Sequence, residues 1–307
     1  MEKPHISVVV PFFNEAESVA ALHQSLIGVL TGMQKPFELI FVDDGSTDGT
    51  WRGLQKLEGV RKIHLSRNYG QTAALSVGIK EARGDVIVTM DGDLENDPAD
   101  IPLLLRKLEE GYDIVSGWRK DRWQDNFFSR RFPSAMANWL ISFVTGIRLH
   151  DHGCTLKAYR AHVLKSIQLT GDMHRMVAAY AARGGARVAE LPVRFESRKY
   201  GVSKYGFSRT FKVLLDILAF HFFYKYARRP IHFFGAIGFL SFFLAFIALL
   251  WAFYLRVFED THFIRTPLPI LVAIFVVVGF QLILMGLLAE IITRTLREKI
   301  EYDEQKT

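Results

Sequence analysis

The chain has 307 residues, of which 50% are hydrophobic, with a formal net charge of +6 and a sequence pI of about 9.3. Its single cysteine, Cys154, excludes an intrachain disulfide, and nothing in the composition points to an oxidising compartment. The basic pI alone does not separate nucleic acid, anionic lipid and phosphorylated substrates as partners. The first apolar run, residues 6–10, is short and is broken by Pro11 and Asn14, so we expect no signal peptide there.

Strands and helices are predicted to alternate along the first 117 residues. Apolar runs predict strands at residues 6–10, 37–43, 60–66, 85–90, 112–117 and, further on, 186–194. Helices are predicted over about 16–31, after the turn cluster 44–49, over about 70–82 and from Pro98. This alternation favours an α/β fold with a doubly wound, mostly parallel sheet. The sequence contains no G-x-G-x-x-G and no Walker-type loop, which argues against a dinucleotide oxidoreductase or a P-loop enzyme.

The stretch VIVTMDGDLENDP, residues 86–98, begins as a buried strand and ends in carboxylates. Asp91 and Asp93 flank one glycine, Gly92, and two carboxylates that close repel each other unless a cation lies between them. Because Mg²⁺ binds through one or two carboxylates plus substrate phosphates, the stretch predicts a metal–diphosphate site. The alternative is an acidic turn in which Asp97 caps the next helix.

Acidic residues follow three of the predicted strands. Glu15 follows the first strand, Asp44 follows the second, and Asp91 and Asp93 follow the fourth. In an open α/β sheet the carboxyl ends of parallel strands meet at one edge, where ligands bind. We therefore expect these side chains to lie near one another.

Basic residues gather in two later segments, 118–131 and 198–205. The first segment contains Arg119, and the second contains Arg198 and Lys204. Each segment is either a phosphate-binding surface or a solvated charged face.

The C-terminal third is predicted to be membrane-associated. Residues 207–226 are aromatic and amphipathic, as in a helix that lies in a membrane interface. Residues 231–255 and 266–289 contain no Asp, Glu, Lys or Arg, and each run exceeds the roughly 20 residues that cross a bilayer. Basic residues flank the outer ends, so we expect the N-terminal domain and both termini on the cytoplasmic side. Four glycines can permit close helix contact, and the oligomeric state is left open: Gly235, Gly238, Gly279 and Gly286.

Five segments taken in order resemble one enzyme family. They are VVVPFFNE (8–15), VDDGSTDGT (42–50), LSRNYGQTAA (65–74), DGDLEND (91–97) and RKYGVSKYG (198–206). The set resembles the inverting glycosyltransferases of family 2, which have the GT-A fold. Within that family it is similar to polyprenyl-phosphate glycosyltransferases, including dolichyl-phosphate mannose synthase, undecaprenyl-phosphate glucosyltransferases and the formamidoarabinose transferase, the last also suggested by DHGCTLKAYR (151–160).

The resemblance implies roles for individual residues. Those that would bind the nucleotide-sugar donor are Pro11, Phe13, Glu15, Val42, Asp44, Asp91, Gly92 and Asp93. Those that would hold a divalent metal, Mg²⁺ or Mn²⁺, are Asp91, Asp93 and Glu95. Glu95 stands where the family usually has a metal-ligating glutamine, so it adds a negative charge. Those that would meet phosphates, and which with the two aspartates form the expected catalytic set, are Arg119, Arg198 and Lys204.

The implied reaction is inverting, metal-dependent transfer of a sugar from a UDP- or GDP-linked donor to a membrane polyprenyl phosphate, undecaprenyl or dolichyl. Glucose or mannose is favoured, and formamidoarabinose or an N-acetylhexosamine is the alternative. A processive polysaccharide synthase is less favoured, because Arg122-Trp123 lacks the Gln of a Q-x-x-R-W motif. A scaffold without activity is a further alternative, and nucleic-acid binding has only the pI behind it. The expected domains are a GT-A catalytic domain (1–205), a juxtamembrane region (206–230), a transmembrane hairpin (231–292) and a cytoplasmic tail (293–307).

Overall fold

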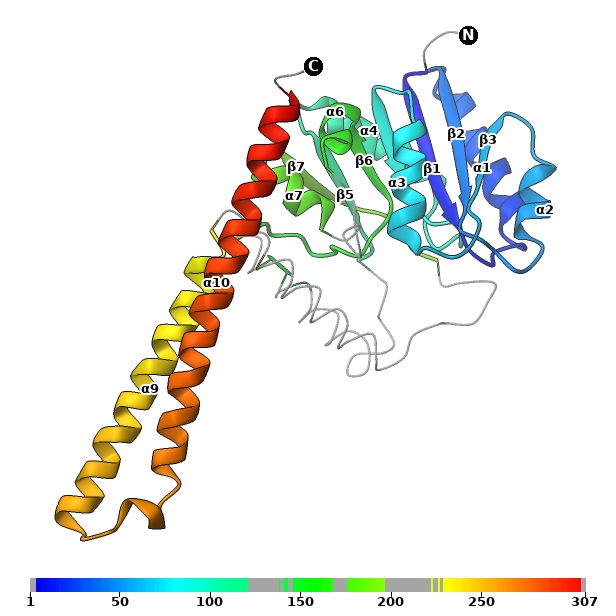
Figure 1. Ribbon diagram of the computed structural model, residues 1–307. Helices are drawn as coiled ribbons and strands as arrows, with labels where there is room; N and C mark the ends of the chain where they lie inside the picture. Colours follow the sequence, from blue (N-terminus) through cyan, green and yellow to red (C-terminus); the bar gives the residue numbers. More distant parts are fainter. Residues whose placement is uncertain are drawn as a thin grey trace. The chain divides into compact units, whose positions relative to one another are not determined.

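The computed structural model describes residues 4–120, 138, 141–142, 146–167, 176–196, 222, 226 and 229–304, with Arg183 and 296–304 described by their backbone only (Figure 1). Two compact units divide the chain, Met1–Leu214 and Leu215–Thr307, and each is taken by itself. The amphipathic segment predicted over 207–226 lies outside the described residues except for Phe222 and Tyr226.

The first unit is built on a mixed sheet. In the described part of the chain this sheet has seven strands in the order β3-β2-β1-β4-β6-β5-β7. The strands are β1 (Ile6–Phe12), β2 (Phe37–Asp43), β3 (Val60–His64), β4 (Val86–Thr89), β5 (Ile114–Trp118), β6 (Lys157–Arg160) and β7 (Val188–Pro192). Every pairing is parallel except those of β6, which runs antiparallel to both β4 and β5. The predicted mostly parallel α/β sheet is confirmed.

Helices cover both faces of this sheet (Figure 1). They are α1 (Val19–Gly32), α2 (Thr50–Gln55), α3 (Gln71–Glu81), α4 (Ile101–Glu109, after the 3₁₀ turn Pro98–Asp100), α6 (Ala161–Lys165) and α7 (Val177–Arg183). Val8 and Val10 of β1 pack in a core with α1, α2 and α4, whereas Val9 packs in a second core with α3, α6 and α7. A strand buried on both faces needs apolar residues at successive positions, and that is how the run 6–10 reads.

Two features of the sheet differ from the sequence expectation. Strand β6 was not predicted, because four residues bounded by Lys157 and Arg160 carry no apolar run. Strand β1 continues through Pro11, which was expected to end it. The Val9 carbonyl accepts the N–H of Met90, and β4 ends at Thr89, so Pro11, two residues further along, lies beyond the pairing with β4. Its missing N–H therefore costs no bond of that ladder.

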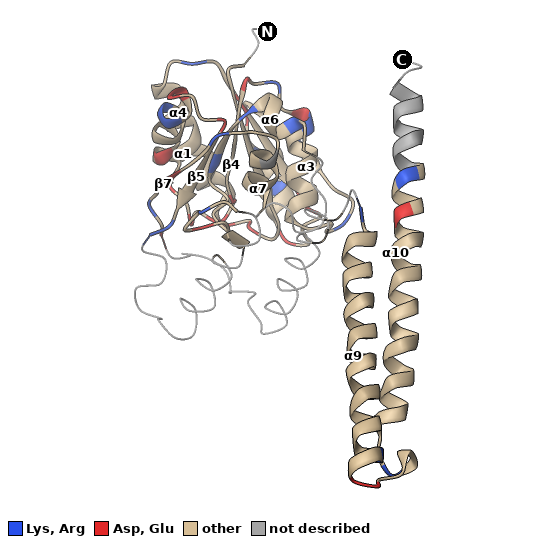
Figure 2. Ribbon diagram, turned by 90° about the vertical axis from the view of Figure 1, so that its left-hand side faces the viewer, with Lys and Arg blue, Asp and Glu red and all other residues tan. Residues whose placement is uncertain are grey.

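The second unit consists mainly of two long helices, α9 (Ile231–Phe258) and α10 (Leu268–Glu304), joined through the 3₁₀ turn Phe263–Arg265. The segments Ile231–Phe258 and Leu268–Thr295 are long and apolar enough to cross a membrane. Of the most apolar 18 residues in each segment, only 22% and 11%, respectively, are buried. A core helix of a soluble protein would be mostly buried, so this low burial favours membrane spans. Figure 2 shows acidic and basic residues at the ends of this pair and none along most of its length.

The glycines of the hairpin serve contact between its own two helices. A Cβ added at Gly238 would lie 3.0 Å from the Gly279 carbonyl oxygen, and one at Gly279 would lie 2.6 Å from the Phe242 ring. A Cβ at Gly286 would lie 2.9 Å from Ile231, whereas Gly235 has open space. Close helix contact is thus confirmed for three of the four predicted glycines.

Candidate active site

The loops that follow β1 and β2 are tied together by hydrogen bonds. The Asp44 N–H donates to the Phe12 carbonyl at 2.8 Å, and the Asn14 N–H donates to Ser46 Oγ at 2.9 Å. The Glu15 N–H donates to the Thr50 hydroxyl at 2.8 Å. Asn14 has a positive φ of 56°, an uncommon conformation that these bonds hold in place. The expected meeting of Glu15 and Asp44 at one edge of the sheet is therefore seen in the backbone.

The loop after β4 joins the same edge. The Ser18 hydroxyl, at the start of α1, donates to the Gly92 carbonyl at 2.6 Å. A Cβ added at Gly92 would lie 2.5 Å from the Phe12 ring and 3.1 Å from the Pro11 carbonyl oxygen. The residue between the two aspartates is thus glycine because the end of β1 packs directly against it.

Asp91 and Asp93 follow β4 at this edge, and the charge of Asp93 acts on Asp91. Partial burial and the neighbouring Asp93 charge raise the pKa of Asp91 to about 7. Asp93 is buried, and its Oδ1 accepts the Glu95 N–H at 3.1 Å. Leu94, between Asp93 and Glu95, has a φ of 62°, a strained conformation for a branched residue. Strain and raised pKa values are both typical of functional sites.

This donor set fits a divalent cation held jointly with a diphosphate. Among the described residues, no group of three or more His, Cys, Asp or Glu side chains is arranged to hold a metal ion. A cation between Asp91 and Asp93 would offset the repulsion that raises the pKa of Asp91, and diphosphate oxygens would complete its coordination. The Glu95 carboxylate instead lies 3.8 Å from Arg119 Nη1, so its role as a metal ligand remains a prediction.

Arg119 forms a buried ion pair with Asp151, a partner that was not predicted from the sequence. Its Nε and Nη2 donate to the two carboxylate oxygens of Asp151 at 2.7 and 3.1 Å, and its side chain is 3% exposed. Burial acts to lower the pKa of Arg119, but attraction to Asp151 outweighs it and the pKa is raised. These two bonds use two of the five N–H groups of the guanidinium, and Nη1 lies 3.8 Å from Glu95 Oε2.

Asp151 itself is held by β7. Glu190 accepts the backbone N–H groups of His150 and Asp151, each at 3.0 Å, and also contacts the His150 ring nitrogen at 2.7 Å. The carboxylates of Asp151 and Glu190 therefore fix the loop that follows Leu149. The sequence signal that could have identified this loop is the D-x-G turn 151–153, where Asp151 accepts the Gly153 N–H at 3.0 Å.

The predicted donor-binding residues differ in their solvent exposure. Phe13 and Glu15 are partly exposed, whereas Pro11 and Val42 are buried. The Val42 side chain packs in the core on the α3 side of the sheet, so only its backbone is placed to meet a nucleoside. Asp44 is buried too, and its two carboxylate oxygens accept the N–H groups of Tyr69 and Gly70 at 2.8 and 2.9 Å.

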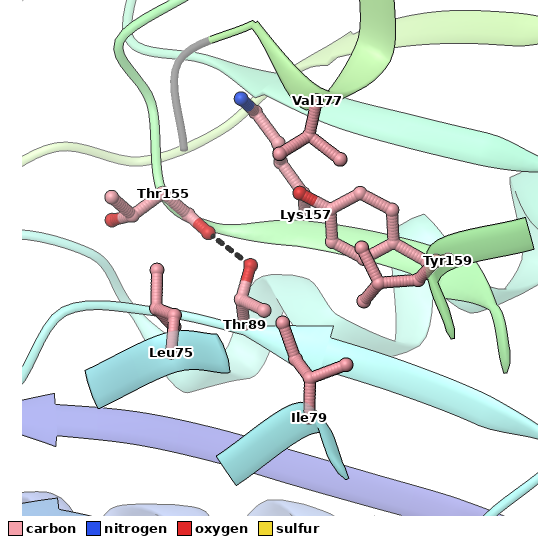
Figure 3. Close-up of a pocket in the computed structure, with 8 residues that line it drawn as sticks. Leu75, Ile79, Thr89, Thr155, Lys157, Tyr159 and Val177 are labelled. Carbon is pink, nitrogen blue, oxygen red and sulfur yellow. Dashed lines mark hydrogen bonds between the residues drawn. The ribbon is translucent and has the colours of Figure 1, made fainter. Parts of the chain in front are cut away.

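Figure 3 shows a small pocket, one side of which is lined by Leu75 and Ile79 of α3. It is lined by Leu75, Ile79, Thr89, Thr155, Lys157, Tyr159, Leu164 and Val177. The Thr89 hydroxyl donates to the Thr155 carbonyl at 2.7 Å, and the buried Lys157 ammonium donates to the His152 carbonyl at 3.1 Å. Burial and the Lys157 charge lower the pKa of His152 to about 4, so this imidazole is neutral near pH 7. These contacts join the end of β4 to β6.

The chain after β7 is attached to the loop of the carboxylates. Asn96 and Phe195 form an antiparallel bridge, and the Glu196 N–H donates to the Glu95 carbonyl at 3.0 Å. Arg194 pairs with Asp97 and Asp100, at 2.9 Å in each case. Asp97 also accepts the Ala99 N–H at 2.9 Å, so its predicted capping role is confirmed alongside the carboxylate pair. The predicted phosphate-binding residues Arg198 and Lys204 follow in sequence and lie outside the described residues.

The mixed sheet with helices on both faces is the GT-A fold, and comparisons with known proteins support this. Residues 7–168 match the model of the family described as Glycosyl transferase family 2. The chain therefore belongs to glycosyltransferase family 2.

Two curated relatives match nearly the whole chain. Dodecaprenyl-phosphate galacturonate synthase of Rhizobium johnstonii is 43% identical over 298 residues, which cover 94% of this chain and 88% of the relative. Undecaprenyl-phosphate 4-deoxy-4-formamido-L-arabinose transferase of Proteus mirabilis is 33% identical over 295 residues, with 94% and 88% covered. Both matches are long enough to reach into the C-terminal hairpin as well as the sheet, so the similarity is not confined to the family domain.

Solved structures share the fold. Glucosyl-3-phosphoglycerate synthase from Mycobacterium tuberculosis, solved with Mn²⁺, uridine diphosphate and phosphoglyceric acid, has a TM-score of 0.57 and 19% identity, covering 71% of this chain and 78% of that one. The same enzyme has also been solved with Mg²⁺ and uridine diphosphate, with a TM-score of 0.53. At this identity the likeness concerns the fold alone.

Proposed function

We propose that this enzyme transfers a sugar from a nucleotide-sugar donor to a polyprenyl phosphate in the membrane, in one displacement with inversion. The observation that carries the proposal is the combination within one chain of a family 2 site and two apolar helices that can span a bilayer. Two relatives of nearly full length carry polyprenyl-phosphate acceptors in their names, which supports the same acceptor class here.

Asp91 and Asp93 are proposed to hold a divalent cation, Mg²⁺ or Mn²⁺, at the donor diphosphate. Such a cation stabilises the negative charge that develops on the leaving diphosphate. The two carboxylates lie at the carboxyl edge of the sheet, beside the backbone of Glu15 and Asp44, where a family 2 donor is expected to bind. Glucosyl-3-phosphoglycerate synthase was crystallised with either ion, which supports a divalent metal without selecting one.

The acceptor needs positive charge more than it needs a base. A phosphate monoester has a second pKa of about 6, so it is already a nucleophilic anion near neutral pH. It must approach a second polyanion, and positioned cations offset that repulsion. We assign this role to Arg198 and Lys204, with Arg119 adding its charge between Glu95 and Asp151.

The relatives and the sequence point to different donor sugars. The sequence favoured glucose or mannose, whereas the relative at 43% identity is named for galacturonate. The relatives named for formamidoarabinose are more distant, at 33% identity. We therefore propose an acidic hexose as the first donor to test and the aminosugar as the second.

We further propose that the sheet unit and both termini are cytoplasmic. Arg229 precedes α9 and Arg294 lies near the end of the second apolar span, and basic residues near span ends stay inside. A protease-accessibility assay on sealed inverted vesicles and on right-side-out vesicles tests this. Cleavage of the sheet unit only in inverted vesicles is expected, and cleavage only in right-side-out vesicles would reverse the assignment.

The function is tested with the full chain in lipid nanodiscs that contain undecaprenyl phosphate. Radiolabelled UDP-galacturonate, UDP-4-deoxy-4-formamido-L-arabinose, UDP-glucose and GDP-mannose are supplied in turn with Mn²⁺ or Mg²⁺. Label from one donor is expected to enter the organic phase and to disappear from it with EDTA. Label in a polymer or in free sugar, with none in lipid, would contradict the acceptor assignment.

A further inference from the structure

The side chain of Asp91 is held by Gln71, a residue of the segment LSRNYGQTAA (65–74). Gln71 is the first residue of α3, and its side-chain amide Nε2 donates to Asp91 Oδ1 at 2.5 Å. Gln71 is only partly buried, so its amide reaches Asp91 from the edge of the site. The bond engages Oδ1 of Asp91 directly.

The position of Gln71 is fixed from the neighbouring strand β2. Asp44, directly after β2, accepts the N–H groups of Tyr69 and Gly70 through separate carboxylate oxygens. Gly70 has a φ of 93°, a conformation that L side chains rarely adopt, so the chain turns sharply into α3 at this point. Asp44 therefore secures the two residues immediately before Gln71.

We propose that Gln71 is a positioning residue that orients the metal ligand Asp91, and that Asp44 acts through Gln71. The proposal rests on the metal-dependent function proposed above. Carboxylate ligands of metals are oriented by hydrogen-bond donors outside the coordination sphere, and loss of such a donor typically weakens metal binding by about 10–100-fold. By holding Oδ1, Gln71 restricts rotation of the Asp91 carboxylate and so fixes the direction in which it meets a cation.

This role for Asp44 differs from the role that the family resemblance implies for it. A residue that only contacts the nucleoside affects donor binding and leaves metal binding by the nucleotide-free protein unchanged. A residue that positions Asp91 alters the affinity for metal even when no donor is present. Metal binding without nucleotide therefore separates the two roles.

The test is titration of Mn²⁺ into the nucleotide-free full chain in nanodiscs, with free Mn²⁺ followed by its electron paramagnetic resonance signal. Gln71→Met keeps the side-chain length and removes the amide donor, and it is expected to raise the Mn²⁺ dissociation constant about ten-fold. The matched control is Gln55→Met, the same change at an exposed glutamine at the end of α2. Equal affinity in Gln71→Met, Gln55→Met and the parent protein would overturn the proposal.

Asp44→Asn provides the second arm. An asparagine presents one acceptor oxygen and one amide donor, so it cannot accept both the Tyr69 and the Gly70 N–H. Nucleotide-free Mn²⁺ affinity is expected to fall severalfold, in the same direction as in Gln71→Met. An unchanged Mn²⁺ affinity with a raised donor KM would assign Asp44 to nucleoside binding alone and remove it from the proposal.

Failure of this inference is distinct from failure of the proposed function. If the parent protein transfers sugar to lipid in EDTA and binds no Mn²⁺, the metal-dependent function itself is wrong. If the parent binds Mn²⁺ and Gln71→Met binds it equally well, only the positioning role is wrong.

Discussion

The sheet unit buries its large apolar side chains, whereas the helical hairpin exposes them. In the sheet unit, Val8 and Phe12 are buried in the core. In the hairpin, Phe239 is 69% exposed and Leu240 is 55% exposed, whereas the small residues Gly238, Ser241 and Ala245 are buried. Water drives apolar groups inward, but lipid is as apolar as leucine and leaves close packing of small residues as the main contact. The difference indicates that the sheet unit is surrounded by water and the hairpin by lipid.

The sheet unit contains a buried ion pair, whereas residues 231–255 and 266–289 of the hairpin contain no Asp, Glu, Lys or Arg. Breaking the buried pair gives the largest expected effect on stability. The sheet unit buries the Arg119–Asp151 pair, and Arg119→Met would leave a buried carboxylate without its partner. Such changes cost about 3–5 kcal/mol of unfolding free energy. A large fall in the melting temperature of the sheet unit is expected by near-ultraviolet circular dichroism.

Lys35→Met is the control for that change, because it removes one member of an exposed ion pair with Glu109. It is expected to leave the melting temperature unchanged. Equal melting temperatures for Arg119→Met and Lys35→Met would show that the buried pair contributes nothing to stability.

A lysine introduced at an exposed apolar position should be costly in the hairpin and nearly neutral in the sheet unit. Phe239→Lys, on the outer face of α9, is expected to disfavour membrane insertion by about 2.5–3.5 kcal/mol. Leu103→Lys, on a 42% exposed residue of α4, is expected to change stability by less than about 0.5 kcal/mol. The measurement is the fraction of each variant recovered in carbonate-washed membranes. Full recovery of Phe239→Lys would argue against a lipid-facing surface at that position.

Glycine permits close contact in both units, and the two contacts are of different kinds. Gly92→Ala would press a methyl group against the Phe12 ring and the Pro11 backbone, at an expected cost of about 1–3 kcal/mol. At Gly279 the three nearest atoms all belong to the Phe242 side chain and none to the backbone, so the expected cost of Gly279→Ala is smaller. Thermal unfolding of each variant measures the difference.

Gly28→Ala is the matched control for both glycine changes. Gly28 lies inside α1, and a Cβ there meets nothing within 4 Å. Alanine is expected to stabilise this helix position by about 0.5–1 kcal/mol. If Gly92→Ala behaved like Gly28→Ala, the close packing at the carboxylate loop would be wrong.

Metal binding is also expected to depend on pH. The metal-free protein holds Asp91 with a pKa raised to about 7, and only the deprotonated carboxylate binds a cation. As the pH falls below 7 protons compete with the metal, so the Mn²⁺ dissociation constant is expected to rise by up to about ten-fold per pH unit. Titration at pH 6 and pH 8 measures this. A dissociation constant that is equal at both values would contradict the raised pKa.

Apolar runs and their spacing predicted most of the sheet and both apolar spans. They did not predict β6, whose four residues are recognisable only by their pairing with β4 and β5. The edge where Asp44 and Asp91 meet was predicted because parallel strands end together. What could not be predicted is side-chain direction across long separations in sequence. Neither the Gln71–Asp91 contact nor the Arg119–Asp151 contact follows from spacing or residue type.

The central claim is that the carboxylates after β4 support sugar transfer to a membrane lipid. The most direct test compares the parent protein with an Asp91→Asn, Asp93→Asn double variant in nanodiscs that contain undecaprenyl phosphate, using the donor that labels lipid best. Removing both charges is expected to lower the rate of label transfer to lipid by at least about 100-fold, since positioned metal charge contributes several kcal/mol to such reactions. A double variant that labels lipid at the parent rate would contradict the account.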